Sequence, residues 1–138
     1  MRNKLVSLLL CVSMLLTLCV GFANAEGEPV TITYAVWDSN QAALLQTVAD
    51  EFHQANPNIT IQIQVNAWSD YWTALEAAAT GGSLPDTFWM HSNNIYYYGS
   101  NDQLLDLTDY IAKSDLVDLK NYPQGLDDIY KINGKQYA

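Results

Sequence analysis

Two stretches of the chain alternate between apolar and polar side chains, which is the pattern of a half-buried β-strand. The first covers residues 30–36 and has four larger apolar side chains on one side: Val30, Ile32, Tyr34 and Val36. The second covers residues 59–65, where threonine and glutamine separate four apolar residues: Ile59, Ile61, Ile63 and Val65. The alternation therefore predicts one strand over each range.

Between these strands the apolar spacing changes to that of a helix. Over residues 41–55 apolar side chains recur every four residues, in a stripe made of Leu44, Val48 and Phe52 and widened by Leu45 and Ala49. This spacing predicts a helix whose stripe is buried against the sheet. Asn56-Pro57-Asn58 ends it. Three successive residues are suitable N-caps: Asp38, Ser39 and Asn40.

A second helix and a third strand follow. Ser69 is the expected N-cap of a helix that runs to Thr80, and Gly81-Gly82 ends this helix. Its buried face is expected to consist of Tyr71, Leu75 and Ala78, with Trp72 and Ala79. Pro85-Asp86 leads into a strand predicted over residues 87–91, in which two side chains are expected in the core: Phe88 and Met90.

Strands that alternate with helices through short links predict an α/β fold, with parallel pairing and right-handed crossovers. The carboxyl ends of parallel strands lie at one edge of the sheet, where ligands bind in open α/β folds. Residues 37–41, 66–69 and 91–94 follow the three predicted strands. We therefore expect these segments to converge on a binding edge.

Shorter patterns occupy the rest of the chain. A short helix is expected over residues 95–99 and an extended segment over residues 104–107. Thr108 is the expected cap of a helical turn that ends at Ala112. Residues 114–128 are expected to be irregular and exposed.

Alternation around Asn133-Gly134 predicts a β-hairpin, since this dipeptide is a strong signal for a two-residue turn. The return strand has barely begun when the sequence reaches Ala138. We therefore expect the complete protein to be longer.

Residues 1–25 have the pattern of a secretory signal peptide. Two basic residues near the start are followed by an apolar run and by Ala23-Asn24-Ala25, which fits an A-x-A cleavage site. We predict cleavage after Ala25 and export to a periplasmic or extracellular location. The alternative is a lipoprotein signal ending at Cys19, whose lipidation would tether the protein to the cell surface.

The charge of the chain restricts its partners. Without the signal peptide, four basic residues remain against 15 acidic ones, so the formal net charge is −11. This balance argues against nucleic acid and against an anionic membrane surface as partners. Both cysteines, Cys11 and Cys19, lie in the signal peptide, so the exported chain depends on packing rather than on disulfides.

Catalytic and metal-binding motifs are absent from the sequence. His53 has no second histidine four residues away, and neither a G-x-S-x-G motif nor a phosphate-binding glycine loop occurs. Asp38 and Asp86 are the only candidates for a glycosidase-type carboxylate pair, but Asp86 precedes its strand and is expected at the opposite edge. We therefore expect no enzymatic activity, no cofactor and no metal.

The expected binding edge combines indole rings with amide and carboxylate groups. Indoles stack on the apolar faces of sugar rings, while amides and carboxylates bond to sugar hydroxyl groups. An anionic ligand would favour arginine, which the exported chain lacks. The candidate ligand-binding residues are Trp37, Asp38, Asn40, Gln41, Trp68, Trp89, His91, Asn93 and Asn94.

Several candidates also have a structural interpretation. Trp89 lies within its predicted strand and fits a core position equally well. Five others fit helix caps or a structural histidine: Asp38, Asn40, Asn93, Asn94 and His91. Trp72 is expected in the core, and the Tyr96-Tyr97-Tyr98 run is expected to divide between core and surface.

Five short motifs follow one another in order along the exported chain. They are Val36-Trp37-Asp38, Phe52-His53-x-x-Asn56-Pro57, Ala79-Thr80-Gly81-Gly82-x-x-Pro85-Asp86-x-Phe88-Trp89, Leu104-Leu105-Asp106-Leu107-Thr108 and Tyr130-x-x-Asn133-Gly134-Lys135-x-Tyr137-Ala138. This series resembles the extracellular solute-binding proteins (family 1) of ABC importers, the group that includes maltose-binding protein.

The resemblance implies a periplasmic-binding-protein-like fold, in which two α/β lobes joined by hinge strands close on a ligand. It implies that residues 26–138 begin the N-terminal lobe and end before the chain crosses to the second lobe. It further implies sugar contacts from the candidate residues other than Trp89, and delivery of the sugar to a membrane permease by a monomeric protein. The alternatives are a secreted carbohydrate hydrolase and a small surface adhesion domain. Alone, this chain is expected to bind sugar weakly or not at all.

Overall fold

The computed structural model describes residues 27–138, so the predicted signal peptide and both cysteines lie outside the described residues. Three parallel strands form the main sheet, in the order β2-β1-β3: β1 (Val30–Val36), β2 (Ile59–Val65) and β3 (Thr87–Phe88). β1 and β2 pair in parallel register over their whole length. The two strands predicted from alternation are therefore confirmed to the residue.

β3 is shorter than predicted, because only Thr87 and Phe88 pair regularly with β1. The predicted strand over residues 87–91 is thus wrong in its second half. One further hydrogen bond continues the ladder, from the Trp89 amide to the Ala35 carbonyl at 3.0 Å, and the chain then turns. β3 lies at the edge of the described sheet, so no second strand among residues 27–138 holds its end extended.

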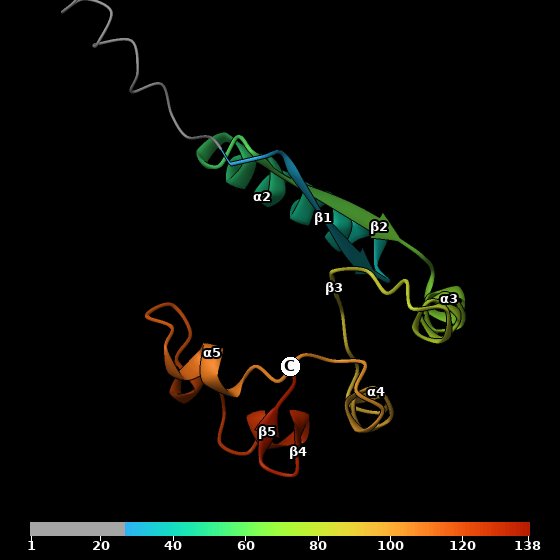
Figure 1. Cartoon of the computed structure of the whole chain (residues 1–138), viewed down its shortest axis with the longest axis vertical. Coiled ribbons are helices and arrows are strands. Elements are labelled where there is room, and N and C mark those ends of the chain that lie inside the picture. Colours follow the sequence, from blue (N-terminus) through green and yellow to red (C-terminus); the bar gives the residue numbers. More distant parts are fainter. Residues whose placement is uncertain (1–26) are drawn as a thin grey trace, which may run out of the picture.

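Helices α2 (Ser39–Ala55) and α3 (Trp68–Gly81) connect the strands. Figure 1 shows α2 alongside β1 and β2, and α3 at the end toward which both strands point. Asp38 is the N-cap of α2, while Gly82 ends α3 in the left-handed conformation that glycine adopts without strain, with φ of 66°. The predicted cap of α3 is wrong, because the helix already begins at Trp68. Ala67 is at the N-cap position, and the Ser69 hydroxyl bonds to Asp70.

α2 packs on the sheet with only one side of the predicted stripe, the side that carries Leu45 and Ala49. Its buried residues are Ala42 and Ala49, and Leu45 on the same face is half-buried. The central line of the predicted stripe is exposed instead, by 71% at Leu44, 61% at Val48 and 41% at Phe52. Successive helix residues are about 100° apart, so this stripe lies roughly a quarter turn from the alanine face. The small alanine side chains allow a closer approach of helix to sheet.

The core lies between α3 and the sheet. Its buried centre consists of Ala35, Tyr71, Leu75 and Tyr98. The half-buried side chains packed around this centre include Trp37, Trp72, Phe88, Trp89 and Met90, as predicted for Trp72, Phe88 and Met90. The tyrosine run divides as expected, since Tyr98 is buried whereas Tyr96 and Tyr97 are exposed.

The remaining elements are short: α4 (Ile95–Ser100), α5 (Thr108–Ala112), the 3₁₀ turns η1 (Leu119–Asn121) and η2 (Asp127–Tyr130), β4 (Lys131–Ile132) and β5 (Lys135–Gln136). The predicted hairpin is confirmed. Asn133 and Gly134 have φ of 52° and 79°, the positive values that a type I′ turn requires.

The predicted cap of α5 is wrong, because Thr108 is the first residue of this helix and Leu107 is at the N-cap position. The Asp106 carboxylate accepts a hydrogen bond from the Thr108 amide at 3.0 Å, as a capping side chain does. The Thr108 hydroxyl accepts one from the Gln136 amide at 2.9 Å. The Thr108 hydroxyl therefore connects α5 to β5.

α4 approaches the hairpin closely at Gly99. A Cβ atom at this position would overlap the terminal methyl group of Ile132 and would lie 3.5 Å from the Tyr137 ring. Both Gly99 and Ile132 are buried. Glycine therefore permits the contact that joins the segment after β3 to the end of the chain.

Candidate functional site

The residues that follow the three parallel strands meet in one aromatic cluster, as the topology predicts. Trp37, directly after β1, lies at its centre. Its ring centroid is 5.1 Å from that of Trp68, at the start of α3, and 4.9 Å from that of Trp89, after β3. Both pairs are edge-to-face, with interplanar angles of 86° and 71°, a geometry that the quadrupoles of aromatic rings favour. We call the five rings of Trp37, Trp68, Trp72, Trp89 and His91 the aromatic edge.

Trp68 is the most exposed ring of the aromatic edge. Its exposed fraction is 47%, whereas the other four residues are half-buried. Its ring is nearly perpendicular to those of three neighbours: Trp37, Trp72 at 5.5 Å and His91 at 5.4 Å. These contacts restrain the plane of the indole, while about half of the Trp68 surface stays exposed to solvent.

Trp89 and Trp72 are more firmly part of the core. The Trp89 indole donates a hydrogen bond to the Tyr34 hydroxyl at 2.7 Å, so its only polar atom already has a partner on β1. The Trp72 indole nitrogen is buried, and no atom of the described chain accepts its hydrogen. Trp72 lies 5.8 Å from Trp37 in a tilted arrangement, so it supports the central ring of the cluster.

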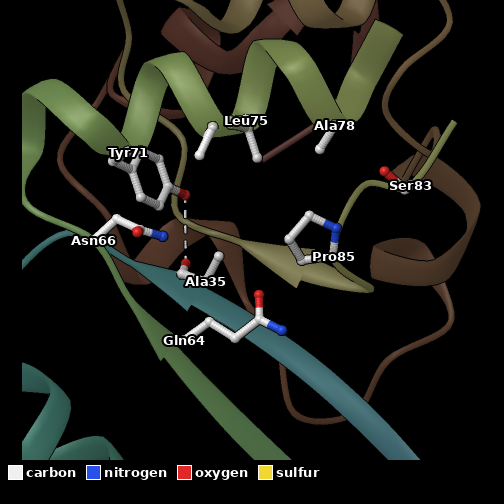
Figure 2. Close-up of a pocket in the computed structure, with 9 residues that line it drawn as sticks. Ala35, Gln64, Asn66, Tyr71, Leu75, Ala78, Ser83 and Pro85 are labelled. Carbon is white, nitrogen blue, oxygen red and sulfur yellow. Dashed lines mark hydrogen bonds between the residues drawn. The ribbon is translucent and has the colours of Figure 1, made fainter. Parts of the chain in front are cut away.

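Tyr71, on α3, lies beneath the aromatic edge with 1% of its surface exposed. Its hydroxyl donates to the Trp89 carbonyl at 2.7 Å and lies 3.4 Å from the Ala35 carbonyl, the contact drawn in Figure 2. Burial raises the pKa of this hydroxyl well above its ordinary value, so it stays a protonated donor. The sequence pattern predicts Tyr71 in the core but does not indicate these partners. A tyrosine among core residues was the available signal, because a buried hydroxyl needs a partner.

An open cavity of about 150 Å³ lies between α3 and the sheet, beside Tyr71 (Figure 2). Its polar lining comes from Gln64, Asn66 and Ser83. None of the nine candidate residues lines this cavity. Four of the candidates instead belong to the aromatic edge: Trp37, Trp68, Trp89 and His91.

Asp38 is committed to the start of α2. Its Oδ1 accepts from the Asn40 and Gln41 amides at 2.8 and 3.1 Å, and its Oδ2 accepts from the Gln41 side-chain amide at 3.3 Å. These hydrogen bonds, first that from the Gln41 backbone amide, lower the pKa of Asp38. Its role as a helix cap is confirmed, and Asn40 is exposed.

On the other side of the edge, His91 forms a local turn. Its Nδ1 accepts a hydrogen bond from the Asn93 amide at 3.1 Å, so in the neutral ring the proton resides on Nε2. Asn94 is the N-cap residue of α4, but its side chain makes no capping hydrogen bond. The side chains of Asn93, which is exposed, and Asn94 are therefore not used to start the helix.

Asp86 lies away from Asp38, as the position of Asp86 before its strand predicts. Its carboxylate accepts from the Thr33 amide and hydroxyl at 2.8 and 2.7 Å, and its amide donates to the Thr33 hydroxyl at 2.9 Å. Thr33 lies in the middle of β1, whereas Asp38 follows the end of that strand. The Thr33 hydrogen bonds lower the pKa of Asp86, whereas a glycosidase acid needs a raised pKa.

Two further properties concern the described chain as a whole. Across residues 27–138, no three His, Cys, Asp or Glu side chains are grouped so as to hold a metal ion. Within the same range, no helix combines the length and the apolar character required to cross a membrane.

The chain matches one protein-family model, that of the bacterial extracellular solute-binding proteins, over residues 47–138. It is also similar to several solved structures. An ABC substrate-binding protein of Listeria monocytogenes, in complex with cycloalternan, is 32% identical with a TM-score of 0.70; the match covers 80% of this chain and 28% of that chain.

Two other structures give the same picture of the fold. A family 1 extracellular solute-binding protein of Alicyclobacillus acidocaldarius is 26% identical with a TM-score of 0.68, over 80% of this chain and 28% of that one. The sugar-binding protein MalE of Xanthomonas citri is 22% identical with a TM-score of 0.73, over 78% and 27%. The predicted periplasmic-binding-protein-like α/β architecture is confirmed, and the chain spans little more than a quarter of the length of these relatives.

Proposed function

Because the chain belongs to the bacterial extracellular solute-binding proteins, we propose that it is part of the substrate-binding component of an ABC importer. Its ligand is a sugar or oligosaccharide, which the complete protein delivers to a membrane permease. Two relatives support this ligand class: the Listeria protein was solved with cycloalternan, and the Xanthomonas protein is a sugar-binding protein.

The exposed indole of Trp68 is the observation on which the proposal rests. A pyranose ring has an apolar face that stacks on a flat aromatic surface, and the contacts that fix Trp68 lower the entropy cost of this stacking. Asn40, Asn93 and Asn94 lie on the segments beside the aromatic edge and supply amide groups for sugar hydroxyls. The exported chain has no arginine for an anionic ligand, so the preferred sugar is neutral.

The binding surface of this chain is one half of a site. We propose that residues 26–138 belong to the N-terminal lobe of a monomeric two-lobe protein, and that a facing lobe closes over the sugar. Closure is favoured because the second lobe contacts the ligand only in the closed state. Alone, this lobe binds sugar with a dissociation constant on the order of 1 mM or weaker.

Export precedes this function. We propose that residues 1–25 act as a signal peptide with cleavage after Ala25, which releases the protein into a periplasmic or extracellular space. The lipidated form at Cys19 is the alternative. Mass spectrometry of the exported protein distinguishes an N-terminus at Glu26 from a lipid-modified Cys19.

Binding without catalysis is the proposed activity. Asp38 caps α2 and Asp86 is bonded to the middle of β1, so neither carboxylate is available as a raised-pKa acid. No observation in the described chain favours the hydrolase or adhesion alternative.

An NMR titration of the ¹⁵N-labelled full chain tests the ligand class. Maltotriose, isomaltotriose and cellotriose are added in turn, and the four indole N–H signals are followed. At least one of these neutral sugars is expected to shift the Trp68 signal in a saturable manner, with millimolar affinity. Saturated digalacturonic acid serves as the anionic comparison and is expected to bind more weakly.

Two variants locate the site. Trp68→Ala is expected to abolish the saturable shifts of the remaining indole signals, because it removes the stacking surface. Tyr110→Ala removes an aromatic ring on α5 that is 64% exposed and lies outside the aromatic edge, and it is expected to leave binding unchanged. Sugar binding that survives Trp68→Ala contradicts the proposed site, and the absence of any sugar-dependent shift contradicts the proposal that this lobe alone binds sugar with millimolar affinity.

A further inference from the structure

The aromatic edge depends on a buried group that does not face the ligand. We propose that Tyr71 is a positioning residue, which fixes Trp37 and Trp89 relative to each other and thereby holds Trp68 in its binding orientation. The inference rests on the proposed sugar-binding function, but its structural part is tested without a sugar. Because only 1% of Tyr71 is exposed, its effect on binding is indirect.

The hydroxyl of Tyr71 joins three elements at the ends of the strands. It carries one hydrogen, and of the two nearby carbonyls that of Trp89 is the closer acceptor, at 2.7 Å against 3.4 Å for Ala35. The Trp89 amide in turn donates to the Ala35 carbonyl at 3.0 Å. Trp89 is therefore held through both its amide and its carbonyl, and the second of these bonds comes from α3.

The shortness of β3 makes this bond necessary. Regular pairing with β1 stops at Phe88, one residue before Trp89. Without the Tyr71 hydroxyl, the peptide that follows Trp89 would be fixed by no hydrogen bond to β1 or α3 and would leave a part-buried carbonyl unpaired. Removal of only one partner leaves the other buried and unpaired, which costs more free energy than replacing both partners by apolar groups.

Ring contacts carry the constraint to the exposed indole. Tyr71 meets Trp37 edge-on at 5.3 Å and 82°, and it meets Trp72 at 5.1 Å and 86°. Trp37 and Trp72 are two of the three rings that fix the plane of Trp68. Displacement of Trp37 would therefore change the orientation of Trp68 through a direct contact, and displacement of Trp89 would act on Trp68 through Trp37.

A matched pair of variants tests the assignment in the full chain. Tyr71→Phe removes the positioning hydroxyl. Tyr98→Phe removes a hydroxyl from another buried tyrosine of the same core, which is 3% exposed and has no hydrogen bond from its hydroxyl to any other described residue. Near-ultraviolet circular dichroism reports the packing of the tryptophan rings, and far-ultraviolet circular dichroism reports the secondary structure.

Tyr71→Phe is expected to lose most of the tryptophan bands in the near ultraviolet while it keeps the far-ultraviolet spectrum, and Tyr98→Phe is expected to keep both. For the sugar bound by the unmodified chain, Tyr71→Phe is expected to weaken affinity by about three- to tenfold, and Tyr98→Phe is not. Unchanged near-ultraviolet bands in Tyr71→Phe, or equal losses in both variants, would overturn the assignment. If the unmodified chain binds no sugar, the proposed affinity of this lobe fails, but the spectra still decide the role of Tyr71.

A measurement on the unmodified protein covers the case in which Tyr71→Phe does not fold. The Tyr71 hydroxyl proton is expected to exchange slowly with water and to give a separate NMR signal with cross-peaks to protons of Trp89. A rapidly exchanging hydroxyl proton overturns the assignment, since a free hydroxyl cannot hold the Trp89 carbonyl.

Discussion

Replacing Gly99 with alanine is expected to disturb the contact between α4 and the hairpin. The added methyl group would overlap the terminal methyl group of Ile132, which is 7% exposed and has little room to move. Gly99 lies within α4, where alanine is otherwise favoured over glycine by about 0.5–1 kcal/mol. Packing is therefore the only effect that opposes the substitution.

The expected magnitude follows from these two opposing effects. Overpacking of a buried contact costs about 1–3 kcal/mol. After subtraction of the gain in helix propensity, Gly99→Ala is expected to lower the free energy of unfolding by about 1 kcal/mol, within a range of about 0 to 2.5 kcal/mol. Ile132→Val removes the overlapping methyl group and costs about 0.5–1.5 kcal/mol alone. In the double variant the alanine methyl occupies the vacated space, so the two losses are expected to be less than additive by about 1 kcal/mol.

Urea unfolding of the four proteins, followed by far-ultraviolet circular dichroism, measures this coupling. The dependence of stability on urea concentration is expected to stay the same in all four, since the surface exposed on unfolding is unchanged. Losses that add within about 0.3 kcal/mol would refute the close approach of Gly99 to Ile132. A stabilising Gly99→Ala would refute it as well.

Three further variants test the packing and the carboxylates. Leu75→Ala, in the centre of the core, is expected to lose about 2–5 kcal/mol in urea unfolding, and a loss below this range would place Leu75 outside the core. Leu44→Gln is expected to change stability by less than about 0.5 kcal/mol because Leu44 is 71% exposed, and a larger loss would restore the face predicted from the sequence. The Thr33 hydrogen bonds hold the pKa of Asp86 below its ordinary value of 3.8, so their stabilisation is present above that pH and is lost as the pH falls through the folded-state pKa. Asp86→Asn is expected to reduce the acid sensitivity of the urea midpoint, and an unchanged pH profile would contradict the Thr33–Asp86 contact.

Much of the fold follows from local patterns in the sequence. The alternation in β1 and β2 predicts both strands to the residue, because one face of each strand is apolar and the other mostly polar. Asn133-Gly134 predicts the hairpin because few other dipeptides adopt two successive positive φ values. The convergence of Trp37, Trp68 and Trp89 follows from parallel topology alone.

Other features depend on contacts that no local pattern contains. The apolar residues of α2 cover a wide arc, from Leu44 past Ala49 to Ala42, and only the sheet decides which part of this arc is buried. β3 is short because it lacks a second partner in the described sheet, which its own residues do not reveal. The role of Tyr71 arises from the position of the Trp89 carbonyl, a backbone atom that side-chain patterns do not locate.

Contact between a sugar and the indole of Trp68 is the most direct test of the proposed site. An isotope-filtered NOE experiment with ¹³C-labelled maltotriose, or with whichever neutral trisaccharide binds, detects protons of the sugar that lie against protons of the protein. The expected result is a set of cross-peaks from the axial sugar protons to the Trp68 ring, which a stacked pyranose produces. Cross-peaks confined to residues outside the aromatic edge, with none to Trp68, would contradict the assignment of this edge as the sugar-binding surface.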